Sequence, residues 1–298
     1  MFDRDSVFLG ITPTGWTNDD FPLLGNDISF GQVVSEMALA GYEGCSVGHN
    51  FPKDRAVLKR ELERRGLRVS EPWVSTLFTA KEMRERTVQN FKDQMAFIKE
   101  MGGTDIVVAE LGGAVHQQPV APLPNKPVFD DRQWRAMVDG LDELGRLAAS
   151  DGMRLCYHHH MGTGVQTRAE VDRLMADTDA EAVHLLLDTG HLFWSGDDPL
   201  ALARDHGDRI KHVHLKDIRV DVLERCTAAR LSFQESVLEG VFTVPGDGVI
   251  DFKPIFQALA DHGFEGWLIV EAEQDPNKAN PLEYARKARQ HIRDLTGL

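Results

Sequence analysis

The feature that most constrains this chain is a regular alternation of short apolar runs with longer amphipathic stretches. The apolar runs have the length of buried strands, and eight of them lie at residues 7–13, 44–48, 67–75, 104–113, 154–160, 183–191, 210–217 and 266–273. Helical patterns separate or follow them, at residues 29–41, 54–66, 84–101, 131–152, 167–177, 198–206, 251–262 and 280–295. Alternating strands and helices predict a parallel α/β fold, and eight such units in 298 residues match a (β/α)8 barrel.

The ends of the first two helical patterns carry capping residues. Ser29 precedes the first pattern and Gly41 ends it, and Asp54 and Gly66 take the same places around the second. A doubly wound open sheet is the alternative fold, but no GxGxxG motif follows the first strand. We therefore predict one α/β domain over residues 1–298, a single (β/α)8 TIM barrel with its active site at the C-terminal mouth.

Two stretches of the chain lack a clear strand or helix period. Residues 112–130 are rich in Pro and Gln, and residues 218–250 contain DVLERCTAARLSFQESVLEG followed by VPGDG. Loops that follow the C-terminal ends of barrel strands build the active site, and long ones often close over it. We expect residues 218–250 to form a lid over the barrel mouth.

The charge and the cysteines restrict the partners and the compartment. The chain has 33 Lys and Arg against 47 Asp and Glu, and a net charge of −14 disfavours nucleic acid and anionic membranes as partners. It also favours a neutral or cationic substrate over a phosphorylated one. Cys45, Cys156 and Cys226 lack a CxxC spacing, which is typical of reduced thiols. With no signal peptide and no run of 18 apolar residues, we expect a cytoplasmic location.

Polar side chains that are costly to bury stand at the C-terminal ends of four apolar runs. In CYHHH, alternation places His158 and His160 on one face of a strand and His159 on the other, where we expect a structural role. The same alternation aligns residues at the ends of the later runs, namely Asp188, then His212, His214 and Lys216, and then Glu271 with Glu273.

A single histidine or glutamate at a strand end is more often structural than functional. Four successive strands with such ends are different, because a barrel brings these side chains to one mouth. Unpaired charges gathered there lower the stability of the fold by roughly several kcal/mol. A divalent metal bound between them offsets that cost. Mixed imidazole and carboxylate ligands suit Mn²⁺, Co²⁺, Fe²⁺ or Zn²⁺, and the ligand set alone does not choose between them.

Several longer motifs resemble the xylose-isomerase-like barrel superfamily of sugar isomerases and epimerases. Within it the chain is most similar to the inosose dehydratases, and the resemblance covers essentially the whole chain. The motifs that carry it are GWTNDD (15–20), SEMALAGYEGCSVG (35–48), YHHHMGTGVQT (157–167), LDTGHLFWSGDDP (187–199), HVHLKDIR (212–219) and WLIVEAEQDPNKANPLEYA (267–285). The last is the most specific, whereas DTGH alone is shared across the superfamily.

The resemblance implies a set of metal ligands. Superfamily members commonly use a Glu after strand five, an Asp in the strand-six motif, a His on strand seven and a Glu on strand eight. The last three correspond to Asp188, His214 and Glu271, but His158 stands in the register of the first Glu. We favour His158 as the fourth ligand, with His160 and Glu273 left open. Mn²⁺ or Co²⁺ is the expected metal, and Zn²⁺ and Fe²⁺ remain possible ions.

The resemblance also implies a chemistry. Epimerases of this group use two metal-bound glutamates as acid and base on opposite faces of a sugar, and His158 disturbs that symmetry. Dehydration does not need it, because a base removes the acidic C–H beside a ketone and an acid protonates the departing hydroxyl. The metal stabilises negative charge on the ketone oxygen. The implied reaction removes water from 2-keto-myo-inositol, a small neutral cyclic polyol-ketone, giving a trihydroxycyclohexane-dione in myo-inositol catabolism.

The resemblance suggests roles for further residues. Glu271 or Glu273 is the predicted general base, and Lys216 and His160 are the predicted proton donors. An ion pair with Asp217 or a glutamate is the structural alternative for Lys216. The predicted substrate contacts are Trp16, Asn18, Glu110, His191 and Arg219. Structural alternatives are rim packing for Trp16, an ion pair for Glu110 and the orientation of a metal ligand for His191.

Three other functions remain in view. A metal-dependent keto-sugar epimerase or isomerase would use the same site. An abasic-site endonuclease needs a DNA-facing basic surface, which the net charge of −14 opposes. A non-catalytic binding module would retain the site without turnover. Barrels of this group often associate, so the resemblance also suggests a homo-oligomer.

Overall fold

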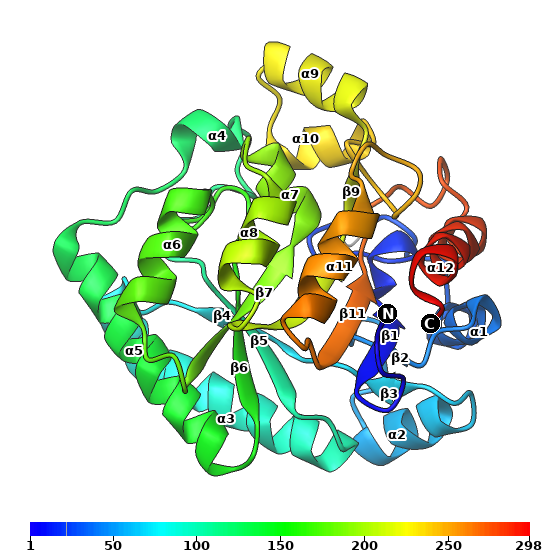
Figure 1. Ribbon diagram of the computed structural model, residues 1–298, viewed down its shortest axis with the longest axis horizontal. Helices are drawn as coiled ribbons and strands as arrows, with labels where there is room; N and C mark the ends of the chain where they lie inside the picture. Colours follow the sequence, from blue (N-terminus) through cyan, green and yellow to red (C-terminus); the bar gives the residue numbers. More distant parts are fainter. Residues whose placement is uncertain (22) are drawn as a thin grey trace.

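A sheet of nine parallel strands forms the centre of the computed structural model, which describes residues 1–21 and 23–298 (Figure 1). The strand order is β3-β2-β1-β11-β8-β7-β6-β5-β4. The strands are β1 (Val7–Ile11), β2 (Gly44–Cys45), β3 (Arg68–Val69), β4 (Trp73–Thr76), β5 (Asp105–Glu110), β6 (Arg154–His158), β7 (Val183–Asp188), β8 (Ile210–Leu215) and β11 (Gly266–Val270).

The two end strands of this order, β3 and β4, belong to one extended segment. The N–H of Ser70 donates to the carbonyl of Cys45 at 3.0 Å, and the N–H of Val107 donates to the carbonyl of Pro72 at 3.1 Å. The segment therefore pairs with β2 on one side and β5 on the other, which closes the sheet. Pro72 interrupts it because proline has no N–H to donate. Counting β3 and β4 as one, the predicted eight-stranded barrel is confirmed.

Helices follow the strands and cover the outside of the barrel. The eight predicted helices are present, as α1 (Phe30–Ala40), α2 (Arg55–Glu63), α3 (Arg84–Met101), α5 (Asp131–Ser150), α6 (Arg168–Asp177), α8 (Pro199–His206), α11 (Phe252–Asp261) and α12 (Pro281–Thr296). Shorter elements that the sequence patterns missed are the 3-10 turns Pro13–Gly15 and Lys81–Met83, α4 (Pro122–Asn125) and α7 (Thr189–Trp194). Ser29 accepts from the N–H of Gln32, and Gly41 ends α1 with φ of 92°, as predicted.

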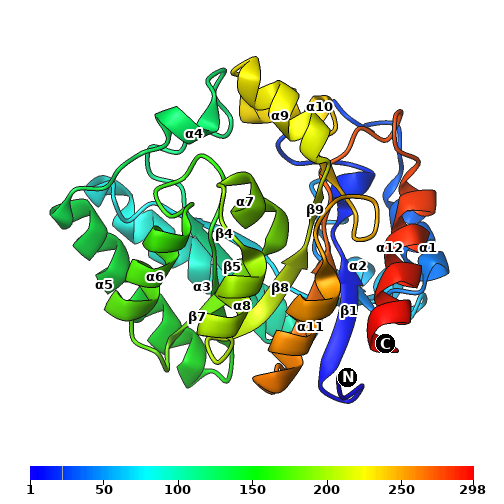
Figure 2. The same ribbon diagram turned by 45° about the horizontal axis from the view of Figure 1, so that its top comes forward.

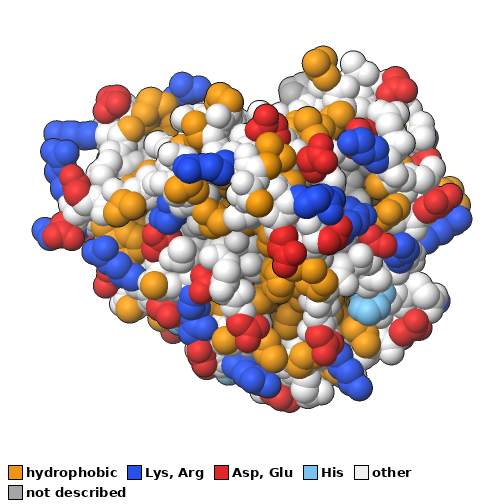
Figure 3. Space-filling model, turned by 90° about the horizontal axis from the view of Figure 1, so that it is seen from above, with side chains coloured by type: hydrophobic (Ala, Val, Ile, Leu, Met, Phe, Trp, Pro, Cys, Tyr) orange, Lys and Arg blue, Asp and Glu red, His pale blue; other side chains and the backbone are white. Residues whose placement is uncertain are grey.

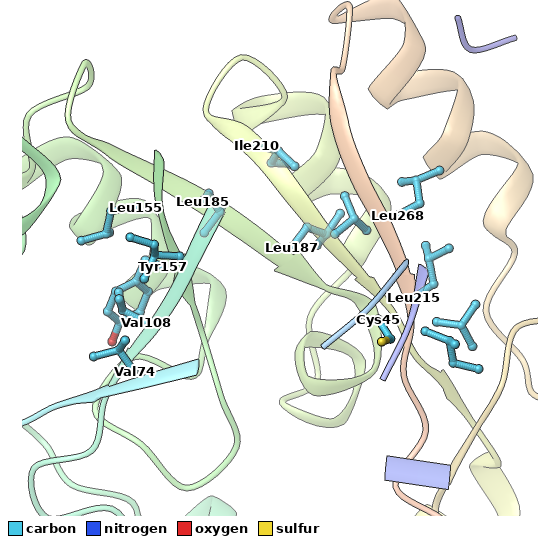
Figure 4. Packing of buried hydrophobic residues seen from close by; sticks show 14 of the residues in the cluster. Cys45, Val74, Val108, Leu155, Tyr157, Leu185, Leu187, Ile210, Leu215 and Leu268 are labelled. Carbon is cyan, nitrogen blue, oxygen red and sulfur yellow. The ribbon is translucent and has the colours of Figure 1, made fainter. Parts of the chain in front are cut away.

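Alternation along the strands separates an outer core from the barrel interior. Outward side chains pack under the helices, as Figure 4 shows for Leu155, Tyr157 and Leu185. Tyr157 reaches the sulfur of Met137 on α5 at 4.0 Å, which places the odd-numbered residues of β6 on the helix side. The inward residues Val107, Cys156 and Leu186 form a small separate cluster. His158 shares the inward register of Cys156 and so points into the barrel.

The predicted lid segment (residues 218–250) is more ordered than its sequence suggested. It contains α9 (Val220–Ala228), α10 (Phe233–Leu238) and β10 (Phe242–Thr243), which pairs antiparallel with β9 (Asp217–Ile218). In Figure 2, α9 and α10 lie at the same end of the barrel as α4. A second hydrophobic cluster lies beneath them, with members Met161, Trp194, Ile218, Val222, Cys226, Phe233, Val237, Val241 and Phe242.

The surface carries mixed charges. On the face seen in Figure 3, acidic, basic and hydrophobic side chains are interspersed, and no large patch of basic residues is visible there. No helix within residues 1–21 and 23–298 is long and apolar enough to cross a membrane. Cys45, Cys156 and Cys226 are buried free thiols, as the sequence predicted.

Candidate active site and metal centre

A cavity of about 220 Å³ opens at the C-terminal ends of the barrel strands. Its size suits a ligand smaller than a drug-sized molecule. Polar residues from several strands line it, as expected for the mouth of such a barrel. The residues predicted from the sequence that line it are Asn18, His158, His160, His191, His214, Lys216, Glu271 and Glu273.

Four side chains converge at this cavity, and all but Asp188 line it. One ligand atom each from His158, Asp188, His214 and Glu271 lies within 4.8 Å of the other three. Nε2 of His158 is 3.4 Å from Oδ2 of Asp188, and Nδ1 of His214 is 2.8 Å from Oε2 of Glu271. The residue in the register of the superfamily's first Glu is therefore the one that joins the group, while His160 lies outside it.

The carboxylate of Asp188 divides its two oxygens between two tasks. Oδ1 accepts the N–H of His191 at 2.8 Å and so caps the start of α7. Oδ2 is buried and has no hydrogen-bond partner in the described part of the chain. The Lys216 ammonium lies 3.6 Å away, just outside hydrogen-bond range. A buried carboxylate oxygen without a hydrogen bond is costly unless a cation is close to it. This oxygen is therefore suited to bind a metal.

The pKa values of His214 and Glu271 also indicate a place for a positive charge between these side chains. Burial acts to raise the pKa of Glu271, but Lys216 and His214 outweigh it and hold that pKa well below its usual range. Burial acts to lower the pKa of His214, but Glu271 and Glu71 raise it to about 10. In the metal-free chain a proton on His214 thus supplies the positive charge, and a divalent metal would replace it. The donor set fits such a metal.

The DTGH motif holds Lys216 in place beside these residues. The hydroxyl of Thr189 donates to the carbonyl of Lys216 at 2.7 Å and accepts its N–H at 3.0 Å. A Cβ on Gly190 would lie 2.6 Å from Cγ of Lys216, so only glycine leaves room for the lysine stem. Nε2 of His191 lies 3.0 Å from Nζ of Lys216. The motif therefore fixes both the carboxylate of Asp188 and a buried ammonium group.

Lys216 lies among three carboxylates. Its Nζ is 2.7 Å from Glu273, 3.2 Å from Glu271 and 3.6 Å from Asp188. Burial opposes its charge, yet these carboxylates outweigh burial and raise the pKa of Lys216 above its usual range. Of the two structural alternatives, the ion pair with a glutamate is formed, to Glu273. The pairing with Asp217 is not, because that carboxylate accepts backbone N–H groups of Ile218 and of the loop 246–250.

The two glutamates of the strand-eight motif differ in their environment. Burial raises the pKa of Glu273 to about 7, against the effect of Lys216 and with a contribution from Glu271. The pKa of Glu271 stays well below its usual range. Neighbouring acids whose pKa values are pushed apart in this way commonly take different roles. Glu271 suits a permanently ionised ligand, and Glu273 suits a group that gains and loses a proton.

The three consecutive histidines have three environments. Nε2 of His159 accepts the N–H of Asp188 at 3.2 Å, which is the structural role predicted for it. Burial and its neighbour His116 lower the pKa of His160 well below its usual range. Nδ1 of His160 lies 2.8 Å from the carbonyl of Met161 and must donate to it, so the neutral ring has no proton on Nε2. This arrangement therefore does not support the predicted role of His160 as a proton donor.

Aromatic rings of the lid segment shield the inner side of the site. The ring of Phe233 stacks on His191 with centroids 5.9 Å apart, and Phe242 meets the same ring edge-on at 5.2 Å. Nζ of Lys216 lies 4.5 Å from the centroid of Phe242. These contacts place apolar rings against one side of the charged groups, which strengthens their electrostatic interactions.

The family model described as "Xylose isomerase-like TIM barrel" matches residues 34–295. The inosose dehydratase of Geobacillus thermodenitrificans is 53% identical over 299 residues, and that of Clostridium beijerinckii is 51% identical over 298 residues, each covering 100% of both chains. The chain belongs to the inosose dehydratase family. These matches confirm both the resemblance to the inosose dehydratases and the barrel fold that the sequence predicts.

Solved structures share the barrel of this inosose dehydratase family at low sequence identity. The IolI protein with a binding zinc atom has a TM-score of 0.72 and 17% identity, covering 97% of this chain and 98% of that one. The probable 3-DHS dehydratase AsbF from Bacillus anthracis has a TM-score of 0.71 and 16% identity, with 96% and 98% covered. At these identities the likeness shows the fold.

Two predicted substrate contacts lie away from the cavity. Trp16 is buried behind it, and its Nε1 donates to Glu36 at 2.6 Å, so it packs at the rim of the barrel. The carboxylate of Glu110 accepts hydrogen bonds from the side chain of Thr76, the N–H of Phe78 and both donors of Thr79. It stabilises the loop after β4 and has no capacity left for a substrate hydroxyl. The structure therefore does not bring either residue to the cavity as a substrate contact.

Arg219, a further predicted substrate contact, does not line the cavity either, because its guanidinium is used at the base of the lid segment. It donates to the carbonyls of Gly240 and Phe242, to Thr243, and to Asp247 at 2.8 Å. These bonds hold both ends of the segment together. A planar donor with several charged or carbonyl partners contributes mainly to stability.

We expect Arg219→Met to lower the free energy of unfolding by about 2 kcal/mol, because several hydrogen bonds of a charged, mostly buried group are lost. KM for the substrate should stay unchanged. Urea unfolding and steady-state kinetics measure the two effects. Arg225→Met is the matched control, since Arg225 pairs on the surface with Asp221 and should leave stability unchanged. A large rise in KM for Arg219→Met would restore the substrate-binding role.

The cavity includes residues that the sequence interpretation did not select. Trp73 on β4 is 44% exposed and lies in the cavity wall, with its ring edge-on to His158 at 5.5 Å. It takes the position that was predicted for Trp16. Glu71 lines the cavity two residues earlier on the same face. The alternation of an acid and an aromatic residue inside the run 67–75 is the signal that identifies them.

Proposed function

We propose that this chain is a metal-dependent inosose dehydratase that removes water from 2-keto-myo-inositol to give a trihydroxycyclohexane-dione. The observation that carries the proposal is the 2.7 Å contact between Lys216 and Glu273 directly beside the donor group of His158, Asp188, His214 and Glu271. The full-length identity to inosose dehydratases supports the same reaction.

The proposed roles follow from the protonation of Glu273 and Lys216. Glu273 accepts the proton of the carbon beside the ketone, and the Lys216 ammonium donates a proton to the hydroxyl that leaves as water. Afterwards Glu273 returns its proton to Lys216 across their contact, so both groups recover their starting states. Since acid and base adjoin each other, proton and hydroxyl leave from the same face of the ring.

The proposed metal would be held by His158, Asp188, His214 and Glu271. When bound, it would supply a positive charge that stabilises the negative charge developing on the ketone oxygen. The zinc of the IolI structure supports a divalent ion at a barrel of this fold. We keep Mn²⁺ or Co²⁺ as the expected ion for this chain, with Zn²⁺ and Fe²⁺ as the alternatives.

The keto-sugar epimerase alternative is less well supported. It would require a second metal-bound acid at the position of His158, and the ring there is buried beside Asp188 with a pKa below its usual range, which burial chiefly causes. Glu273 and Lys216 lie together instead of on opposite sides of the cavity. An acid–base pair on one side suits elimination better than inversion of a carbon centre.

The proposal also covers the lid segment, the oligomeric state and the location of the protein. We infer that residues 218–250 act as part of a single barrel domain and close over the small neutral substrate, since Phe233 and Phe242 already cover His191. A homo-oligomer and a cytoplasmic location remain predictions from the sequence.

Incubation with 2-keto-myo-inositol and Mn²⁺ or Co²⁺ should give a product that absorbs ultraviolet light and weighs one water less than the substrate. A dehydrated dione or its enol absorbs, whereas epimerisation leaves the mass unchanged. Prior treatment with a chelator should abolish turnover, and added metal should restore it. An unchanged mass with a new stereoisomer would favour the epimerase, and turnover that survives complete metal removal would exclude metal dependence.

A further inference from the structure

A chain of polar side chains runs through the barrel interior beneath the metal centre. Such interiors are normally filled with branched apolar residues. Here Glu71, His212 and Asp105 are almost fully buried. Asp105 and Arg154 are the first residues of β5 and β6, so they lie at the end of the barrel opposite the mouth. This chain of polar side chains therefore links the metal centre with the far end of the barrel.

The distances along this chain fall from the mouth downwards. Nε2 of His214 is 3.8 Å from Oε1 of Glu71, and Oε2 of Glu71 is 3.6 Å from Nε2 of His212. Nδ1 of His212 is 3.0 Å from Oδ2 of Asp105. Nε of Arg154 donates to Oδ1 of Asp105 at 2.7 Å. The lower part is tightly bonded, while the upper part stops just short of direct hydrogen bonds.

Arg154 closes the lower end of the chain. Its side chain is 28% exposed, and it also donates to the carbonyl of Glu265 at 3.2 Å. Burial acts to raise the pKa of Asp105, but the hydrogen bond from His212 and the charge of Arg154 outweigh it, and the pKa is lowered. Asp105 therefore carries a charge in the barrel floor and fixes the ring of His212.

Glu71 is the unexplained member of this chain. Both of its carboxylate oxygens are buried and lack a hydrogen-bond partner among the described residues. Leaving a buried carboxylate in that state is costly. The Nε2 atoms of His214 and His212 lie 3.8 and 3.6 Å from these oxygens, and both are also buried and without a hydrogen bond among the described residues. Small movements would bring both rings into hydrogen bonds with Glu71.

We propose that Glu71 is a positioning residue for the metal ligand His214. Glu71 would accept a hydrogen bond from Nε2–H of His214. The proton would then stay on Nε2, and Nδ1, the nitrogen that faces Glu271 and Asp188, would be free to bind the metal. A carboxylate that orients a metal-bound histidine in this way fixes the tautomer and makes the ligand more basic. His212, held by Asp105, keeps Glu71 in place from below. This inference rests on the proposed metal-dependent function.

A second metal between Glu71, His212 and His214 is the competing explanation, because these side chains also lie within 4.8 Å of one another. It would require His214 to bind one ion through each nitrogen and so to lose both ring protons. A hydrogen bond to Glu71 needs no such ionisation. The number of ions bound per chain separates the two explanations.

Glu71→Gln tests the proposal through metal binding measured without substrate, by calorimetric titration with Mn²⁺ and with Co²⁺. We expect one ion per chain in both proteins and an affinity about 10- to 100-fold weaker in the variant. Glu71→Asp should restore part of the loss. The melting temperature of the metal-free protein should change little, because neither carboxylate oxygen of Glu71 makes a hydrogen bond in the described structure. A merely structural role would lower that temperature and leave the affinity unchanged.

A second variant tests the lower end of the chain of polar side chains, at the barrel floor. Arg154→Met should weaken metal affinity a few-fold although it lies at the barrel floor, since Asp105 loses its partner. Lys211→Met is the matched control, because Lys211 precedes His212 on β8 and points to the opposite face. It should leave the affinity unchanged.

The outcomes separate failure of the inference from failure of the proposed function. If the unaltered protein binds Mn²⁺ or Co²⁺ and Glu71→Gln binds it equally well, the positioning role is overturned while the function stands. Two ions in the unaltered protein and one in Glu71→Gln would establish a second metal site instead. If the unaltered protein binds neither ion nor Zn²⁺, both the metal-dependent function and the role of Glu71 are overturned.

Discussion

Replacing Lys216 with methionine is expected to lower kcat by about 10²–10⁴-fold, the usual contribution of a general acid. Methionine fills the space of the lysine stem beside Gly190 but carries no proton for the leaving hydroxyl. Metal content should be retained, because removing the ammonium leaves Asp188 and Glu271 without a competing cation. Steady-state kinetics and elemental analysis of the purified variant measure the two quantities.

Two further variants decide whether Lys216 transfers a proton or only balances charge. Lys216→Arg keeps the positive charge, but a guanidinium does not release its proton, so it should remain as inactive as the methionine variant. Glu273→Gln should lose a similar factor, and the double variant should be no slower than either single one, since the two groups act as a unit. Full activity of Lys216→Arg would reduce Lys216 to a charge-balancing role.

The barrel could be predicted from the sequence because its signals are local. Helix period, capping residues such as Ser29 and Gly41, and apolar strand runs are all visible within short windows. The candidate ligands could be found for the same reason, since alternation along one strand separates His158 from His159. Parallel strands then bring strand ends together without further information about packing.

The site predictions that the structure does not support concern residues whose environment depends on distant segments. Glu110 is saturated by donors from residues 76–79, and Trp16 is turned away by Glu36 on α1. The tautomer of His160 depends on one carbonyl, that of Met161, which no pattern of side chains reveals. Glu71 was missed because its partners His212 and His214 come from a strand about 140 residues away along the chain.

Asp188→Asn is expected to lower kcat/KM by at least about 10³-fold through loss of the metal, since removal of several kcal/mol of charge stabilisation has this effect. The substitution is nearly isosteric. An asparagine Oδ1 can still accept the N–H of His191 and cap α7, while the amide replaces the unpartnered Oδ2. The helix should therefore persist, and the metal ligand should be lost. Elemental analysis of protein prepared without chelator, together with kinetics, measures the effect.

Asp198→Asn is the matched control, because Asp198 caps the neighbouring helix α8 through the N–H of Leu200. It should keep its metal and its activity, which separates loss of a cap from loss of a ligand. Circular dichroism of both variants should match the unaltered protein. If Asp188→Asn retains one ion per chain and full turnover, Asp188 is only a helix cap, and the donor group proposed for the metal must be assigned to other residues.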